Sequence, residues 1–164
     1  MSDNGPMQPT EDGEAIAFVQ GFEARWPHYA PFLIHIPNEG MVRSANGSHI
    51  GKVLKRRRMG VKAGTSDYFL AYPTSQHCGL WLELKRPGGT VRHDQLDFLR
   101  HMGKQGYMIA VAWGAIAAMA AVQACIEHRR EPDPFGMPAC FLPDGRMYRF
   151  SEVTLTGSVR QRHG

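Results

Sequence analysis

The sequence predicts an α/β fold in which a single mixed β-sheet is flanked by helices. Residues 107–113 form a nearly continuous apolar run, which is typical of a strand buried on both faces. In residues 80–85, leucines alternate with tryptophan, glutamate and lysine, as in a strand with two different faces. Helical patterns lie before and after these two runs, so we expect helices on both faces of the sheet.

The first predicted helix begins after Thr10 and runs to about Arg25. Thr10 is a favourable N-cap residue, and three acidic residues in the first turn suit the positive end of the helix dipole. Ile16, Val19 and Phe22 recur at a helical period, and a Trp-Pro pair follows the last turn.

The remaining elements are assigned from their periodicity and from the turn residues between them. We expect strands at residues 32–36, 67–72, 80–85 and 107–113, and helices at residues 47–59, 91–102 and 115–128. Leaving aside the helix at residues 47–59, which lies in the basic segment, the predicted core has the order αβββαβ, followed by one more helix.

The length of 164 residues fits one domain with a short appendage. We expect a disordered lead at residues 1–9, the folded domain at residues 10–130 and a C-terminal extension at residues 131–164. The extension is rich in proline, glycine and charge, and Pro143-Asp144-Gly145 predicts a hairpin turn that a flexible tail follows.

The composition excludes several classes of protein. Apolar residues make up 43% of the chain, which is too many for a disordered protein. No run reaches the roughly 18 apolar residues of a membrane span, and we find no signal peptide. The spacings of the three cysteines match no zinc pattern, and an odd number suits a reducing compartment. We therefore expect a cytoplasmic protein that does not bind a membrane.

A basic run lies between the first two predicted strands. Six basic side chains fall within eleven residues that contain no acid, at Lys52, Lys55, Arg56, Arg57, Arg58 and Lys62. Such a run favours a polyanionic partner, although a solvated helical face is an equally good interpretation of the run alone.

Three charged side chains on two neighbouring strands form the candidate active site. Glu83 and Lys85 are two residues apart, so they project from the same face of their strand. Asp67 begins the preceding strand, after glycine-containing residues that allow close backbone approach. If the two strands pair as a hairpin, Asp67 lies near Glu83 and Lys85. Two carboxylates can hold Mg²⁺, and a neighbouring lysine can stabilise charge that develops during phosphodiester cleavage.

The lysine has two possible roles in such a site. Lowering a lysine pKa from about 10.4 to 7 costs about 4–5 kcal/mol of differential interaction. The two carboxylates oppose that change until a metal neutralises them. We therefore favour a charged Lys85 that positions water or stabilises charge, and keep the general-base role as the weaker alternative.

These residues stand in an order and spacing that resemble the VRR-NUC (virus-type replication–repair nuclease) domain of the PD-(D/E)XK restriction-endonuclease-like superfamily. The resemblance covers about residues 10–124 and rests on residues 35–38, 60–67, 79–89, 94–95 and 105–107. There are departures: Ser66 stands where the family usually has proline, Glu39 separates the usual Asn-Gly pair, and the chain after about His128 has no counterpart.

The resemblance implies a role for each matching residue. Asp67, Glu83 and the backbone carbonyl of Leu84 would bind the metal, and Lys85 would be the catalytic lysine. Gln95 would help to place the water or the metal. A glutamate of the first helix would join the site, either Glu11 or, failing that, Glu14. The nucleic-acid-binding residues would be Asn38 and the basic run.

The resemblance also implies an activity. The expected protein is a Mg²⁺- or Mn²⁺-dependent DNA endonuclease of bacterial or phage origin that acts in DNA repair. It would select DNA structure, such as flaps, branches or four-way (Holliday) junctions. A domain this small offers one active site, so cutting both strands would need a homodimer. The alternatives are a DNA-binding module of the same fold with little cleavage, and an exonuclease or RNA-acting enzyme.

Overall fold

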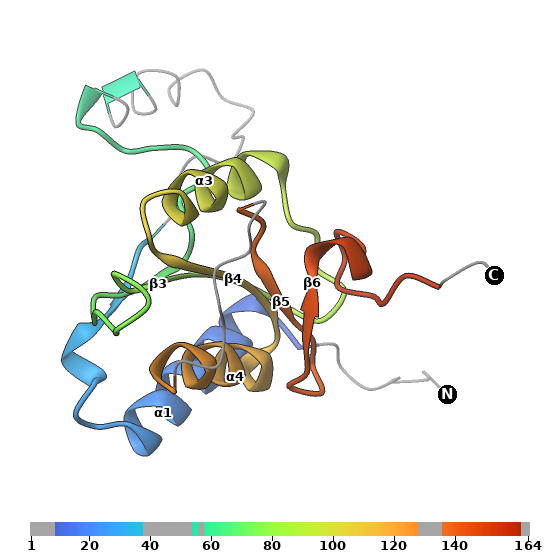
Figure 1. Ribbon diagram of the computed structural model, residues 1–164, viewed down its shortest axis with the longest axis horizontal. Coiled ribbons are helices and arrows are strands. Elements are labelled where there is room, and N and C mark those ends of the chain that lie inside the picture. The colour runs from blue at the N-terminus through green and yellow to red at the C-terminus, as the bar shows by residue number, and fades with distance from the viewer. Residues whose placement is uncertain (1–8, 38–53, 56–57, 128–135, 162–164) are drawn as a thin grey trace, which may run out of the picture.

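The computed structural model describes residues 9–37, 54–55, 58–127 and 136–161. These residues form a six-stranded mixed sheet with helices on both faces (Figure 1), which confirms the predicted α/β class. The elements in chain order are α1 (Glu11–Arg25), η1 (Ala30–Phe32), β1 (Leu33–His35), β2 (Tyr68–Leu70), β3 (Leu80–Lys85), α3 (His93–Gly103), β4 (Met108–Trp113), α4 (Ala115–Ile126), β5 (Ala139–Phe141), β6 (Met147–Arg149) and η2 (Phe150–Glu152).

The six strands lie side by side in their chain order. Strands β1, β2 and β3 are antiparallel neighbours, β3, β4 and β5 are parallel neighbours, and β6 returns antiparallel to β5. Parallel neighbours need a crossover connection, and α3 and α4 lie in the two crossovers. The central strand β4 is buried along its whole length, as its apolar sequence predicts.

The two faces of the sheet carry separate hydrophobic clusters. On one face, α1 and α4 cover the leucines of β3 and the alanines of β4. On the other face, α3 covers Val111 and Trp113 of β4 through Leu96 and Leu99. Figure 1 shows this arrangement, with α3 on the opposite side of the sheet from α1 and α4.

Helix α1 begins and ends where the sequence predicts. The Thr10 side chain accepts a hydrogen bond from the Gly13 N–H at 3.1 Å and caps the helix. The buried positions are Phe18 and Phe22, whereas Ile16 is 59% exposed. At about 100° of rotation per residue, Ile16 lies roughly 200° from Phe18 around the helix, so both cannot face the sheet. The periodic spacing of apolar residues that begins at Ile16 therefore does not identify the buried face of α1.

The C-terminal segment corrects the expected division of the chain. The hairpin at Pro143-Asp144-Gly145 is present and joins β5 to β6. However, β5 pairs with β4 and all three of its residues are buried, so the hairpin completes the main sheet. Residues 150–161 form no free tail, because Val153 is fully buried and the Val91 N–H donates to the Leu155 carbonyl at 2.9 Å. The folded domain therefore continues past residue 130.

Some predictions lie outside the described residues. They include the disordered lead, apart from residue 9, and most of the helix expected at residues 47–59, of which residues 54–55 and 58 are described and helical. Within the described part of the chain, no helix is both long and apolar enough to span a membrane.

Candidate active site

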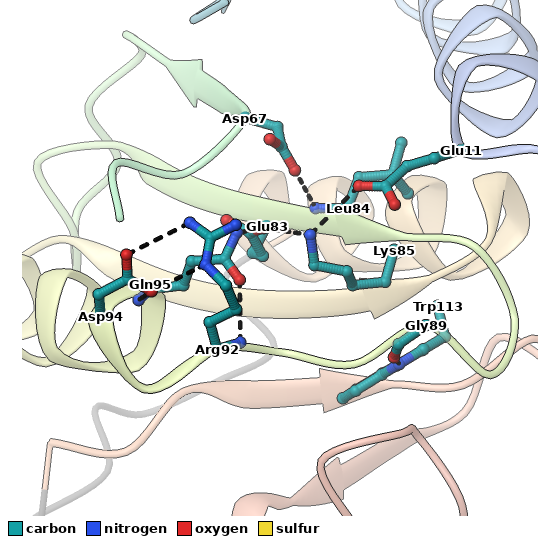
Figure 2. Close-up of polar contacts among 10 residues, drawn as sticks. All are labelled: Glu11, Asp67, Glu83, Leu84, Lys85, Gly89, Arg92, Asp94, Gln95 and Trp113. Carbon is teal, nitrogen blue, oxygen red and sulfur yellow. Dashed lines mark hydrogen bonds and ion pairs between the residues drawn. The ribbon is translucent and has the colours of Figure 1, made fainter. Parts of the chain in front are cut away.

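Pairing of β2 with β3 brings the predicted site together. The register sets Tyr68 opposite Leu82, so Asp67, just before β2, lies beside the carboxyl end of β3. The Asp67 Oδ2 atom accepts a hydrogen bond from the Leu84 N–H at 3.0 Å, as Figure 2 shows. The Asp67 carboxylate thus accepts a hydrogen bond that a backbone carbonyl of a paired strand would otherwise accept. The expected pairing of the two strands as a hairpin is confirmed.

The glycine before Asp67 is required by close packing. Gly64 has a φ of 75°, and a Cβ atom there would overlap the Asp94 carbonyl at the start of α3. Only glycine adopts this conformation without strain and also permits that approach. The loop before β2 is therefore held against α3, which fixes where Asp67 enters the site.

Glu83 is the most buried charged residue of the site, with no exposed surface. Its Oε1 atom accepts a hydrogen bond from Gln95 Nε2 and lies 2.7 Å from Lys85 Nζ. Its Oε2 atom is buried and has no hydrogen-bond donor among the described residues. Burial, and secondly the Asp67 carboxylate, raise the pKa of Glu83 to about 8.

Asp67 and Glu83 form a pair of carboxyl groups that repel each other when both are ionised. Burial also raises the pKa of Asp67, against the lowering effects of the Lys85 ammonium and the Leu84 N–H. When Glu83 is protonated, it can donate a hydrogen bond to Asp67, which raises its own pKa and lowers that of Asp67. In the absence of another cation, the pair therefore favours holding a proton.

Lys85 lies between two carboxylates. Its Nζ atom is 2.7 Å from Glu83 Oε1 and 3.2 Å from Glu11 Oε1, and the residue is only 7% exposed. Burial by itself would lower the pKa of Lys85, but the Glu83, Asp67 and Glu11 carboxylates outweigh it and raise the pKa. This environment favours a permanently charged lysine over a general base.

Gln95 connects the start of α3 to Glu83. The residue is 2% exposed, and its Oε1 atom accepts the Arg92 N–H at 3.0 Å while its Nε2 atom donates to Glu83. Both ends of the amide are thus fixed. The structure places Gln95 against a carboxylate of the site, where it holds one oxygen of Glu83 and leaves the other oxygen free to bind a ligand.

The structure separates the two glutamates of the first helix. Glu11 contacts Lys85, whereas the Glu14 Oε2 atom accepts the Ala115 N–H at 2.6 Å and caps the start of α4. Gly114 precedes α4 and supplies no side-chain cap, so Glu14 from α1 serves this role. Glu11 therefore belongs to the candidate site, and the fallback residue Glu14 does not.

The predicted nucleic-acid-binding residues are only partly described. Lys55, Arg58 and Lys62 are exposed, whereas Asn38, Lys52, Arg56 and Arg57 lie outside the described residues. Lys62 is connected to the site through the loop that leads to Asp67, because Thr65 Oγ1 donates to the Lys62 carbonyl at 2.9 Å.

The oxygen atoms around Asp67 fit a hard divalent cation. The N–H and C=O groups of one strand residue point to the same edge, so the Leu84 carbonyl faces the edge that Asp67 occupies. No cluster of three or more His, Cys, Asp or Glu residues suited to a metal occurs in the described ranges. Mg²⁺ needs fewer, because it is usually bound by one or two carboxylates and keeps several waters. The unpartnered Glu83 Oε2 atom is consistent with such a site.

Sequence reasoning missed Arg92, which lies beside the site and pairs with Asp94. The signal that could have identified it is an arginine directly before the first turn of a helix, where a capping side chain is usual.

Comparisons with known proteins agree with this geometry. The family model described as the VRR-NUC domain matches residues 20–115, which include Asp67, Glu83, Lys85 and Gln95. A solved structure described as a VRR_NUC domain protein has the same fold, with a TM-score of 0.63 and 22% sequence identity over 74% of this chain and 92% of that chain. No curated protein matches the chain. Because the family model covers more than half of its length, the chain belongs to the VRR-NUC family, a nuclease-type family.

Proposed function

We propose that this domain is a metal-dependent DNA endonuclease that hydrolyses phosphodiester bonds and selects branched structures. One observation carries the proposal: a buried glutamate oxygen with no donor faces a second carboxylate, next to a charged lysine. A purely structural ion pair would not place two buried carboxyl groups against each other, because their repulsion when both are ionised costs folding free energy.

Mg²⁺ or Mn²⁺ is the cation that this set of atoms suits. Asp67, Glu83 and the Leu84 carbonyl would hold it, since all three provide hard oxygen ligands. When bound, the ion supplies Lewis-acid polarisation of the phosphoryl group and makes water more acidic. The cation would also replace the proton that the two carboxyl groups otherwise share.

Lys85 would stabilise negative charge on the phosphate as the transition state forms. Its ammonium group is charged and is oriented by Glu83 and Glu11, so little reorganisation is needed at the moment of reaction. Gln95 fixes the orientation of Glu83, and Glu11 restrains Lys85 from the side of α1. The four side chains thus keep one charged donor and two carboxylates in fixed relative positions.

Two other functions remain as alternatives within the same fold. A DNA-binding module with little cleavage would not require the buried Glu83–Lys85 pair, whose burial costs stability. An exonuclease would use the same site chemistry but would need a free DNA end. The proposed substrate is double-stranded or branched DNA. Because each chain offers one site, cleavage of both strands would need a homodimer. The protein would act in the cytoplasm of a bacterium, with or without phage infection.

The test uses labelled linear, nicked, flap and four-way DNA with Mg²⁺, with Mn²⁺ and with EDTA. Asp67→Asn is compared with Asp97→Asn, which makes the same chemical change at an exposed position of α3. We expect cleavage of branched DNA only with metal, strong loss in Asp67→Asn and normal activity in Asp97→Asn. Binding without cleavage under every condition would support the module, and cleavage in EDTA would contradict the proposed mechanism.

A further inference from the structure

Arg92 presents a partly exposed guanidinium group next to the candidate active site. Its side chain is 57% exposed and forms a two-point ion pair with Asp94, with Nε 3.0 Å from Oδ1 and Nη2 3.3 Å from Oδ2. Arginine has five N–H donors, and these two contacts leave three of them for another acceptor. The guanidinium is thus oriented by Asp94 without being saturated.

The position of Arg92 is not explained by helix capping. It is the N-cap residue of α3, where Ser, Thr, Asp and Asn are preferred because their side chains accept hydrogen bonds. Arginine has no acceptor. The Gln95 N–H is instead accepted by Asp94 Oδ1 at 3.1 Å, so Asp94 serves the helix end. Positions that break a local preference are commonly functional or strained, and Arg92 has to be explained by something other than capping.

The carboxamide group of Gln95 lies between the backbone N–H of Arg92 and the carboxyl group of Glu83. Gln95 Oε1 accepts the Arg92 N–H, and Gln95 Nε2 donates to Glu83 Oε1. Figure 2 shows the Arg92 guanidinium lying toward Glu83 and Gln95. In agreement, the pKa of Arg92 is raised mainly by Asp94 and in addition by the Glu83 and Asp67 carboxylates.

We propose that Arg92 is a substrate-binding residue that binds a phosphate of the DNA backbone next to the phosphodiester bond that is cut. The inference rests on the proposed nuclease function and extends the site by one residue. The planar guanidinium fork can bind two phosphate oxygens at once. Lys85 is assigned to the phosphate that is cut, and its ammonium group is held between Glu83 and Glu11. A neighbouring phosphate therefore needs a second, more exposed donor, and the Arg92 side chain is such a donor. Asp94 holds the fork in place before the DNA arrives.

The experiment compares Arg92→Ala and Arg92→Lys with Arg100→Ala, which removes the same charge from an exposed position in the last turn of α3. Binding of a labelled four-way DNA is measured with Ca²⁺ in place of Mg²⁺, over a series of salt concentrations. We expect Arg92→Ala to weaken binding by about 10- to 100-fold. We also expect it to reduce the slope of log affinity against log salt concentration by about 1.

Arg92→Lys keeps the charge but loses the fork, so its affinity should fall between those of the wild type and Arg92→Ala while its salt slope stays near that of the wild type. Arg100→Ala should behave as the wild type. Thermal unfolding is recorded for every variant, and Arg92→Ala should melt close to Arg100→Ala, because the Arg92–Asp94 pair is exposed to solvent.

Two outcomes would overturn the inference. One is an Arg92→Ala affinity and salt slope equal to those of Arg100→Ala, and the other is weakened binding with a lowered melting temperature and an unchanged slope. The proposed function fails separately, if the wild type does not cleave DNA with any metal. A change in binding specific to Arg92 would then still identify a phosphate contact.

Discussion

Both faces of β3 are largely buried, although Trp81 on the charged face is partly exposed, and the two faces are stabilised in different ways. Leu80, Leu82 and Leu84 are each 1% exposed and pack against α1 and α4. On the opposite face, Glu83 and Lys85 are 0% and 7% exposed and depend on each other, on Gln95 and on Glu11. The apolar face is complete as it stands, whereas the charged face retains an unpartnered oxygen at Glu83. One strand thus stabilises the fold on one face and gives up some stability for function on the other.

Glu83→Gln should show the largest effect, and it should be an effect on activity alone. The amide has nearly the same shape but cannot provide an anionic ligand, so we expect cleavage to fall by about 1000-fold, or about 4 kcal/mol. Because the pKa of Glu83 is about 8, its carboxyl group is mostly protonated at neutral pH without metal. The metal-free variant should therefore unfold at nearly the same urea concentration as the wild type.

Leu80→Ala should show the opposite behaviour. Removing a buried leucine from the other face of β3 is expected to cost about 2–5 kcal/mol of unfolding free energy. Cleavage per folded molecule should stay close to that of the wild type, since Leu80 lies at the far end of β3 from Lys85. Urea unfolding measures the unfolding free energy, and single-turnover cleavage at low temperature measures the cleavage rate per folded molecule. Loss of cleavage in the fully folded variant would show that the two faces are coupled.

The metal-free protein should lose stability as the pH rises. The pKa of Glu83 is raised by folding, from 4.5 to about 8, so its carboxyl group favours the folded state most below pH 4.5, and this contribution is lost as the pH approaches 8. Melting temperatures recorded across this range should therefore fall, while Glu83→Gln should show a flatter profile. Saturating Mg²⁺ should raise the wild-type melting temperature most at the alkaline end of the range. A flat wild-type profile would contradict the assigned environment of Glu83.

Two glutamates one turn apart in α1 provide the smallest and most specific comparison. Glu14→Ala removes the cap of α4 and should cost about 1 kcal/mol of unfolding free energy. Glu11→Ala removes a partner of Lys85 and should reduce cleavage several-fold, with little change in stability, because Glu11 is half exposed. Urea unfolding and cleavage assays on both variants check the assignment, and an exchange of the two phenotypes would refute it.

The strands around the site could be predicted from sequence because the relevant signals are local. The alternation in residues 80–85 gives the bounds of β3, and the glycines before Asp67 indicate a turn that lets this residue meet β3. Pro143-Asp144-Gly145 likewise predicts the hairpin between β5 and β6.

The features that sequence did not predict depend on tertiary packing. Glu11 and Glu14 are three residues apart on one helix face, so their sequence positions do not distinguish them. Glu14 accepts the Ala115 N–H only because α1 packs against α4. The three residues of β5 are too few to show a periodic pattern, so nothing in the sequence shows that this strand pairs with β4. The proximity of Arg92 to Glu83 depends on how α3 packs on the sheet.

The most direct test of a metal-dependent endonuclease is single-turnover cleavage of closed circular DNA in Mg²⁺ by the wild type, Lys85→Ala and Lys104→Ala. Lys104 is an exposed lysine that follows α3, so its replacement controls for the loss of one positive charge. We predict that the wild type and Lys104→Ala convert the circle to nicked or linear DNA, whereas Lys85→Ala is slower by at least about 100-fold. An intact circle with the wild type, or equal cleavage by all three proteins, would contradict the account.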